Sequence, residues 1–243
     1  PLGGLARRGA WLQRARENAG ASLLLDSGDL FFERYRKAIP PEKAPALGEK
    51  AQLILACSRL LGYDALGIGD DDLTLGKDFL VGLSKQAGFP FVSSNLVDKA
   101  TGHALFQTHV IKERGGWRIG VFSLLSPNFL SGESDPRTEG IAFREPLEEA
   151  KSILEKIRPE TDLVVLLSHL GYTADIELAE TLPGIDVILG GHSGRSLSYP
   201  IRIKDTIIVQ LGSKGLHVGE LRLQPTPGRS SRLDSSLKAA IPL

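Results

Sequence analysis

Short apolar runs alternate with longer amphipathic stretches along this chain. The apolar runs are typical of strands buried on both faces, and the amphipathic stretches have the period of helices. The pattern predicts strands over residues 22–25, 65–68, 91–93, 163–167 and 187–189. It predicts helices over residues 5–18, 48–61, 77–86, 146–157 and 175–181. This alternation of strands and helices predicts an α/β protein.

Hairpin patterns occur in the middle and at the end of the chain. Residues 103–113 and 117–124 are β-rich and are joined by Arg114–Gly115–Gly116, a hairpin signal. Further strands are expected over residues 199–203, 206–211 and 218–223, and proline and glycine predict loops over 30–47 and 128–144. Since βαβ and hairpin units share one chain, we expect a layered α/β/β/α sandwich of two mixed sheets flanked by helices.

The ends of the chain suggest a boundary on each side. Residues 1–224 are expected to form one domain, and the Pro/Ser/Gly-rich residues 225–243 a tail or linker. The chain begins at Pro1 and contains no Met, so we expect a processed or truncated sequence, with any signal peptide or anchor upstream.

Composition excludes some partners. The 29 Lys and Arg residues balance the 29 Asp and Glu residues, so no nucleic-acid polymer or anionic membrane surface is expected as a partner. No apolar stretch is long enough to span a bilayer. Neither the oligomeric state nor the cellular compartment follows from these residues.

Four predicted strands are each followed by a side chain that can bind a metal. Ligands in open α/β sheets bind at the carboxyl ends of strands, so these side chains should converge. Carboxylate and imidazole together suit Zn, Mn or Fe more than Ca. Taken singly, each side chain has a commonplace alternative, because most acidic loops are solvated and most histidines are structural. The four candidate ligands are Asp29, Asp70, His169 and His192.

Three consecutive carboxylates follow the second of these strands, at Asp70, Asp71 and Asp72. Adjacent anions repel one another, and burial raises their pKa values unless a cation compensates. A bound divalent ion would remove that cost. By contrast, His103, His109 and His217 lack acidic neighbours of this kind, so we expect structural roles for them.

The motifs resemble those of the metallophosphoesterase (calcineurin-like) domain. The resemblance is carried by Asp-x-Gly-Asp at 26–29, Gly-Ile-Gly-Asp-Asp at 67–71, Ser-His-Leu-Gly at 168–171 and Gly-Gly-His-Ser at 190–193. More narrowly, they look like the 5'-nucleotidase, 2',3'-cyclic phosphodiesterase and UDP-sugar hydrolase branch. The resemblance implies a phosphate-ester small molecule as substrate, two metal ions that activate water, and an extracytoplasmic location.

Carried over by position, the resemblance implies a metal-bridging role for Asp29. Asp70 stands where the family usually has Asn, and His169 and His192 would complete the shell of the second metal. The family's first metal also takes ligands from an Asp-x-His motif on the opening strand, which would lie upstream of Pro1.

Several positions depart from the family pattern. This chain has Gly194 where the family has the second His of Gly-His-x-His. It has Asp71 where the family has a catalytic His, and Thr74 where the family has the Asp that orients that His. An anionic Asp71 beside a phosphate dianion is unfavourable unless a metal or a proton offsets it. Arg195 could supply positive charge for a phosphate, or it could be an exposed loop residue.

Two functional hypotheses follow. In the first, the protein is a metal-dependent phosphoric-ester hydrolase with an altered centre of one or two divalent ions. Mn, Zn or Fe are expected there, with Mg and Ca as alternatives. In the second, it is a catalytically degenerate module of the same fold that binds one metal or a protein partner. Nucleotide specificity is not carried over, because little of the chain follows Gln224, where the family has a nucleotide-binding domain.

Overall fold

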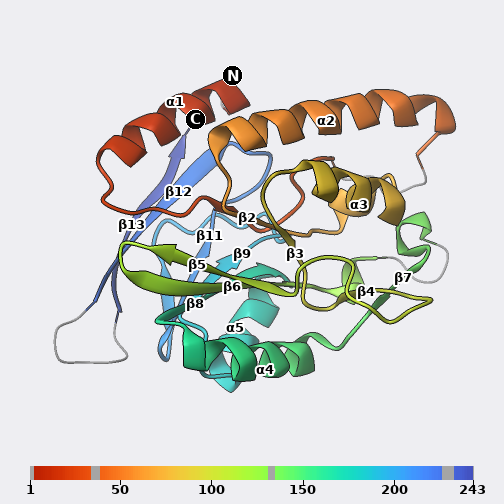
Figure 1. Cartoon of the computed structure of the whole chain (residues 1–243). Coiled ribbons are helices and arrows are strands. Elements are labelled where there is room, and N and C mark those ends of the chain that lie inside the picture. The colour runs from red at the N-terminus through yellow and green to blue at the C-terminus, as the bar shows by residue number, and fades with distance from the viewer. Residues whose placement is uncertain (1–2, 34–38, 131–134, 226–232, 243) are drawn as a thin grey trace.

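Two sheets lie face to face at the centre of the structure, with helices outside them (Figure 1). The structure is a computed structural model that describes residues 3–33, 39–130, 135–225 and 233–242. The smaller sheet is wholly parallel and has the order β1-β2-β3. Its strands are β1 (Leu25–Asp26), β2 (Ala65–Gly67) and β3 (Phe91–Val92).

The larger sheet has six strands in the order β10-β11-β9-β8-β6-β5. Its four inner strands are parallel, and each edge strand pairs antiparallel with its neighbour, so this sheet is mixed. The strands are β5 (His109–Arg114), β6 (Trp117–Leu125), β8 (Leu163–His169), β9 (Val187–Gly190), β10 (Ile201–Ile203) and β11 (Thr206–Gln210).

Helices cover the outer face of each sheet (Figure 1). On the side of the smaller sheet lie α1 (Leu5–Glu17), α2 (Ala44–Leu61) and α3 (Lys77–Gln86). On the side of the larger sheet lie α4 (Pro146–Ile157) and α5 (Tyr172–Thr181). The layered α/β/β/α arrangement predicted from the sequence is therefore confirmed, although only the larger sheet is mixed.

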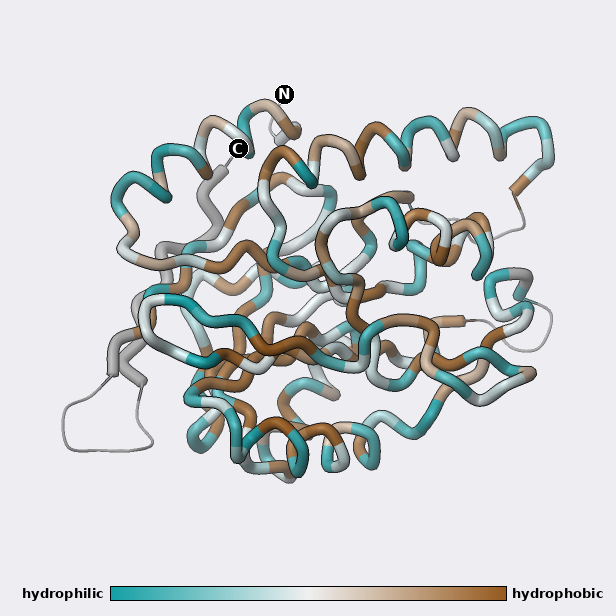
Figure 2. The backbone as a smooth tube through the Cα atoms, viewed as in Figure 1, coloured by the Kyte–Doolittle hydropathy of each residue, from teal (hydrophilic) through white to brown (hydrophobic). Residues whose placement is uncertain are grey.

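Hydrophobic residues concentrate on the central strands (Figure 2), and their side chains pack between the layers. Successive residues of a strand point to opposite faces, so each inner strand contributes to two cores. In β8, Leu166 packs towards α4 and α5, whereas Leu167 packs between the sheets. In β2, Leu66 packs in the core that contains the α2 and α3 side chains, and Ala65 packs between the sheets. This burial holds the strand ends in place.

Some element boundaries differ from the sequence prediction. Helices α3 and α4 have the predicted bounds. Helix α2 begins at Ala44, inside the predicted loop 30–47, because Pro45 lies in the first turn, where a missing N–H costs nothing. The predicted loop 128–144 contains strand β7 (Ile141–Phe143), which pairs antiparallel with β4 (Leu96–Asp98).

The end of the chain also differs. Strands β12 (His217–Pro225) and β13 (Leu233–Pro242) form an antiparallel ribbon, so residues 233–242 are not the irregular tail expected from composition. Residues 226–232 and 243 of that expected tail lie outside the described residues. The division of the chain at residue 224 stays a prediction.

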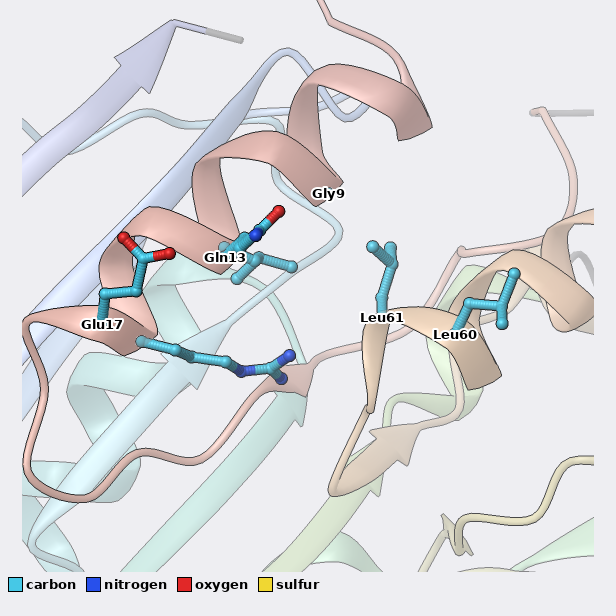
Figure 3. Close-up of a pocket in the computed structure, with 7 residues that line it drawn as sticks. Gly9, Gln13, Glu17, Leu60 and Leu61 are labelled. Atoms are coloured by element: carbon cyan, nitrogen blue, oxygen red, sulfur yellow. The ribbon is translucent and has the colours of Figure 1, made fainter.

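A hollow of about 620 Å³ lies between α1 and α2 (Figure 3). Its lining shares no residue with the four candidate metal ligands. None of the described helices is both long enough and apolar enough to cross a bilayer. The residues that line the hollow are Gly9, Leu12, Gln13, Arg16, Glu17, Leu60 and Leu61.

Candidate metal centre

The four candidate ligands meet at the carboxyl ends of strands in both sheets. One ligand atom from each of Asp29, Asp70, His169 and His192 lies within 4.8 Å of all the others. The His169 Nε2 atom is 3.2 Å from a carboxylate oxygen of Asp29 and 3.2 Å from Asp70 Oδ1. The His192 Nδ1 atom is 2.9 Å from the same Asp70 oxygen. The convergence expected from the strand ends is present.

The ring of His169 has the arrangement of a metal ligand. Its Nδ1 atom lies 2.8 Å from the Ser27 carbonyl oxygen, which can only accept, so Nδ1 carries a proton. In the neutral ring the Nε2 lone pair then faces the carboxylates. This nitrogen is buried and makes no well-directed hydrogen bond, despite the two oxygens at 3.2 Å. A backbone carbonyl that fixes the ring in this way is typical of histidine ligands.

The carboxylates beside His169 favour a positive charge at its ring. Burial lowers the pKa of His169, but the Asp29 charge and contacts with Asp70 and Ser27 outweigh burial and hold that pKa well above its ordinary value. Without another cation, the ring therefore takes a proton to balance the carboxylates. A divalent ion could displace that proton and use the same lone pair, so the residues present fit a metal.

Both candidate histidine ligands lie beside the carboxylate of Asp70. Its Oδ1 atom faces His169 and His192, and its Oδ2 atom accepts a hydrogen bond from Arg137 at 3.3 Å. Burial raises the pKa of Asp70, but the two imidazoles outweigh burial and hold the pKa well below its ordinary value. Asp70 therefore stays an anion, as a metal ligand must.

Asp72 ties the two acidic loops together. Its carboxylate accepts from the backbone N–H of Asp29 at 2.8 Å and of Gly69 at 3.0 Å. It also accepts from the N–H groups of Leu30 and Phe31 at 2.9 and 3.2 Å. Burial and the nearby Asp29 raise the pKa of Asp72, against the hydrogen bonds from Gly69, Phe31 and Asp29. Asp72, the third member of the Asp triplet, thus binds backbone N–H groups of both loops and is not among the four clustered ligands.

Both acidic loops need glycine because their backbones touch. A Cβ atom on Gly69 would lie 2.2 Å from an Asp29 carboxylate oxygen and 2.7 Å from His169 Cε1. A Cβ on Gly28, which has φ of +103°, would lie 2.3 Å from the Gly69 nitrogen. Asp29 and His192 themselves have φ of 58° and 61°. Such conformations persist only where surrounding contacts enforce them.

A buried polar network supports the histidine loops from behind. Asp175 accepts from the Ser168 hydroxyl at 2.5 Å and from Gln210 Nε2 at 2.9 Å. Gln210 in turn accepts from the Ser193 hydroxyl at 2.6 Å. Ser168 and Ser193 are the chain neighbours of His169 and His192. The network therefore couples both ligand loops to α5 and β11.

The Phe129 ring packs against both histidine ligands. Its ring stacks on His192 with centroids 3.3 Å apart and planes 4° apart, and it meets His169 edge-on at 6.3 Å. The ring comes from a short 3-10 helix, Pro127–Phe129. Because it sits in the predicted loop 128–144, no periodicity in the sequence indicated it.

Asp71 lies at the position where the resemblance places a catalytic residue. It is buried, its backbone N–H donates to Asp29 Oδ1 at 2.9 Å, and its Oδ1 accepts from Arg137 at 3.3 Å. The Thr74 hydroxyl donates to the Asp71 carbonyl at 2.5 Å. Asp71 therefore has a cation beside it, which the sequence had not identified, and its catalytic role stays a prediction.

Arg195 is exposed, and its guanidinium carbon stacks 4.3 Å above the Tyr172 ring. Its backbone nitrogen donates to the Ser193 hydroxyl at 3.4 Å, next to His192. The side chain is thus held at the margin of the site. Its role in binding substrate stays a prediction.

Comparisons with known proteins agree with this geometry, although no protein-family model matches the chain. A 5'-nucleotidase of Vibrio cholerae serotype O1 is 28% identical over 208 residues, which cover 78% of this chain and 36% of that protein. The structure of a 5'-nucleotidase precursor from Thermus thermophilus has a TM-score of 0.80 and 28% identity, over 100% of this chain and 49% of that one. The chain is similar in sequence and fold to 5'-nucleotidases, and it shares its fold with a calcineurin-like phosphoesterase, YfkN of Bacillus subtilis.

Another solved structure is similar over the same length. The sulfate thiohydrolase SoxB of Thermus thermophilus has a TM-score of 0.85 and 27% identity, over 100% of this chain and 43% of that one. The chain spans about a third of the length of the curated relatives it matches. The resemblance found in the motifs is therefore confirmed for the fold and for the similarity to 5'-nucleotidases.

Gly69→Ala tests the close approach of the two acidic loops. The added methyl would displace Asp29 and His169, so we expect a loss of stability of about 1–3 kcal/mol in urea unfolding, together with weaker Mn²⁺ binding by calorimetry. The matched control is Gly82→Ala in α3, where a Cβ meets nothing within 4 Å. That control should gain up to about 1 kcal/mol. Equal stabilities for the two variants would contradict the proposed packing.

Asp175→Asn tests the buried network through pH. Burial raises the pKa of Asp175 from 3.8 to about 6, against hydrogen bonds from Ser168 and Gln210. The stabilisation from its proton is complete below about pH 3.8 and is lost as the pH rises through about 6. Asparagine has no such proton. Relative to the variant, the wild type should therefore lose about 2 kcal/mol of unfolding free energy between pH 4 and 7.5.

Urea unfolding at several pH values measures this difference. Asp205→Asn, at an exposed carboxylate in the turn before β11, should keep the wild-type profile. Parallel profiles for the wild type and Asp175→Asn would contradict the assignment.

Proposed function

We propose that the chain is the metal-binding domain of a metal-dependent phosphoric-ester hydrolase whose substrates are small phosphate esters such as nucleotides. The observation that carries the proposal is the cluster of two carboxylates and two imidazoles within 4.8 Å. The relatives named 5'-nucleotidase support the substrate class. A location outside the cytoplasm is part of the same proposal and rests on the resemblance.

The donor set supports one or two divalent ions, with Mn, Zn or Fe favoured over Mg and Ca. Such an ion would supply a Lewis acid for a phosphoryl oxygen and an acidic water. Asp29 and Asp70 would hold it through oxygen, and His169 and His192 through nitrogen. The Ser27 carbonyl keeps the His169 lone pair directed at the ion. Phe129 restrains the His192 ring.

The degenerate-module hypothesis is not favoured. It was motivated by Asp71, Thr74 and Gly194, which differ from the family's catalytic positions. Those changes leave the four-ligand cluster assembled, and the curated relatives include 5'-nucleotidases and a nucleotide phosphodiesterase. A module that only bound a protein partner would not need the buried Nε2 atom of His169 to face two carboxylates.

A second candidate reaction is hydrolysis of a sulfur ester, because SoxB, a sulfate thiohydrolase, aligns over the whole chain with a TM-score of 0.85. Charge also favours it. Asp70 and Asp71 are carboxylates at positions where the resemblance has neutral Asn and His, and a sulfate monoester carries one negative charge where a phosphate monoester dianion carries two. The carboxylates would therefore repel a sulfate less.

His169→Ala tests the main proposal. It removes one of four ligands and should reduce Mn²⁺-dependent hydrolysis of p-nitrophenyl phosphate and AMP by about 100-fold or more, the loss expected when a metal site is disrupted. His103→Ala, at an exposed histidine outside the cluster, is the matched control and should keep full activity.

The same assays separate the candidates. Turnover of p-nitrophenyl sulfate but not of the phosphates would favour the sulfur-ester reaction. Absence of hydrolysis with every divalent ion would contradict the proposed function.

A further inference from the structure

Arg137 is a buried cation among three buried carboxylates. Its side chain is 10% exposed, and those of its partners Asp70, Asp71 and Asp135 are 4%, 9% and 8% exposed. It belongs to a short 3-10 helix, Pro136–Thr138. Buried charges of one sign are costly unless each has a partner. Arg137 is therefore part of the charge balance of the site.

The two ends of the guanidinium have different partners. Asp135 anchors one side, accepting from Nε at 3.0 and 3.2 Å and from Nη2 at 2.7 Å. The Nη1 atom faces the ligand cluster and lies 3.3 Å from both Asp70 Oδ2 and Asp71 Oδ1. A guanidinium fixed on one side presents its other donors in a set direction. Arg137 thus fixes a positive charge at the edge of the cluster.

Asp70 divides its two oxygens between a cation and the histidines. Oδ2 accepts from Arg137, and Oδ1 faces His169 and His192. With Oδ2 held, the carboxylate cannot rotate without losing this bond, so Oδ1 stays directed at the cluster. The same Nη1 atom holds Asp71, the neighbouring anion, which would otherwise repel Asp70.

We propose that Arg137 is a positioning residue that supplies part of the metal's positive charge when no ion is bound. It keeps Asp70 and Asp71 paired and oriented, so the site is formed before a metal arrives. This inference rests on the proposed metal-dependent function. It predicts that folding of the wild type depends little on metal.

Replacing this charge should make folding depend on the metal. In Arg137→Gln, the carboxylates of Asp70, Asp71 and Asp135 lose a shared cation, so a bound divalent ion compensates a larger part of their charge. Glutamine also removes the repulsion between the guanidinium and an incoming ion. Both effects increase the stabilisation that metal binding gives to the folded state.

The test is the thermal midpoint of the 243-residue chain in excess EDTA and in excess MnCl₂. In EDTA, we expect Arg137→Gln to melt at least about 6 °C below the wild type, as for a broken buried ion pair. MnCl₂ should recover most of that loss, so that Mn²⁺ raises the midpoint of the variant more than that of the wild type. Arg158→Gln is the matched control, because Arg158 pairs with Asp186 at 2.5 Å outside the cluster. The thermal midpoint of Arg158→Gln should lie below that of the wild type by the same amount in EDTA and in MnCl₂.

An equal loss in EDTA and in MnCl₂ for Arg137→Gln, as for Arg158→Gln, would overturn the inference and leave Arg137 as a structural anchor. If Arg137→Gln does not fold in EDTA, Arg137→Lys decides. Lysine keeps the positive charge, so Mn²⁺ should raise the thermal midpoint of Arg137→Lys about as much as that of the wild type. An increase as large as that expected for Arg137→Gln would overturn the inference. Calorimetric titration of the wild type with Mn²⁺ separates the two proposals. If the wild type does not bind Mn²⁺ in this titration, the proposed function is overturned. If it binds Mn²⁺ but Arg137→Gln loses the same thermal midpoint in EDTA and in MnCl₂, only this inference is overturned.

Discussion

The compensation of buried carboxylates is the constraint on which the site depends. Asp29, Asp70, Asp71 and Asp72 lie within two touching loops, and burial alone would make four such anions unstable. Hydrogen bonds and ion pairs compensate Asp70, Asp71 and Asp72. Asp72 accepts four backbone N–H groups, Asp71 pairs with Arg137, and Asp70 is shared between Arg137 and two imidazoles. The side chains that converge on one point are those of Asp29, Asp70, His169 and His192, which could bind a cation.

The two-sheet core makes this concentration of charge tolerable. Strands β2 and β8 are buried on both faces, so apolar packing fixes their positions. Their carboxyl ends then deliver Asp70 and His169 to neighbouring positions. Behind them, the Ser168–Asp175–Gln210 network connects the histidine loops to α5 and β11. The position of the ligands is thus determined by the fold, and their orientation by polar contacts.

Much of this could be predicted from the sequence, because it depends on local patterns. Apolar runs locate the strands, and the residues that follow them include the clustered Asp29, Asp70, His169 and His192. Arg137 and Phe129 could not be predicted, since both come from an irregular segment and meet the site only through contacts distant in sequence. The different roles of Asp70, Asp71 and Asp72 depend on the backbone direction of one short 3-10 helix, Asp71–Leu73, which composition does not reveal.

Diffraction from a crystal of the chain grown with Zn²⁺, measured on both sides of the zinc absorption edge, tests the central claim most directly. The account predicts an anomalous peak within about 2.0–2.2 Å of a ligand atom from each of Asp29, Asp70, His169 and His192. The account would be contradicted by the absence of a peak, with Asp70 still 2.9 Å from His192 and 3.2 Å from His169 as in the present structure. In that case the cluster would be a hydrogen-bonded charge network and not a metal centre.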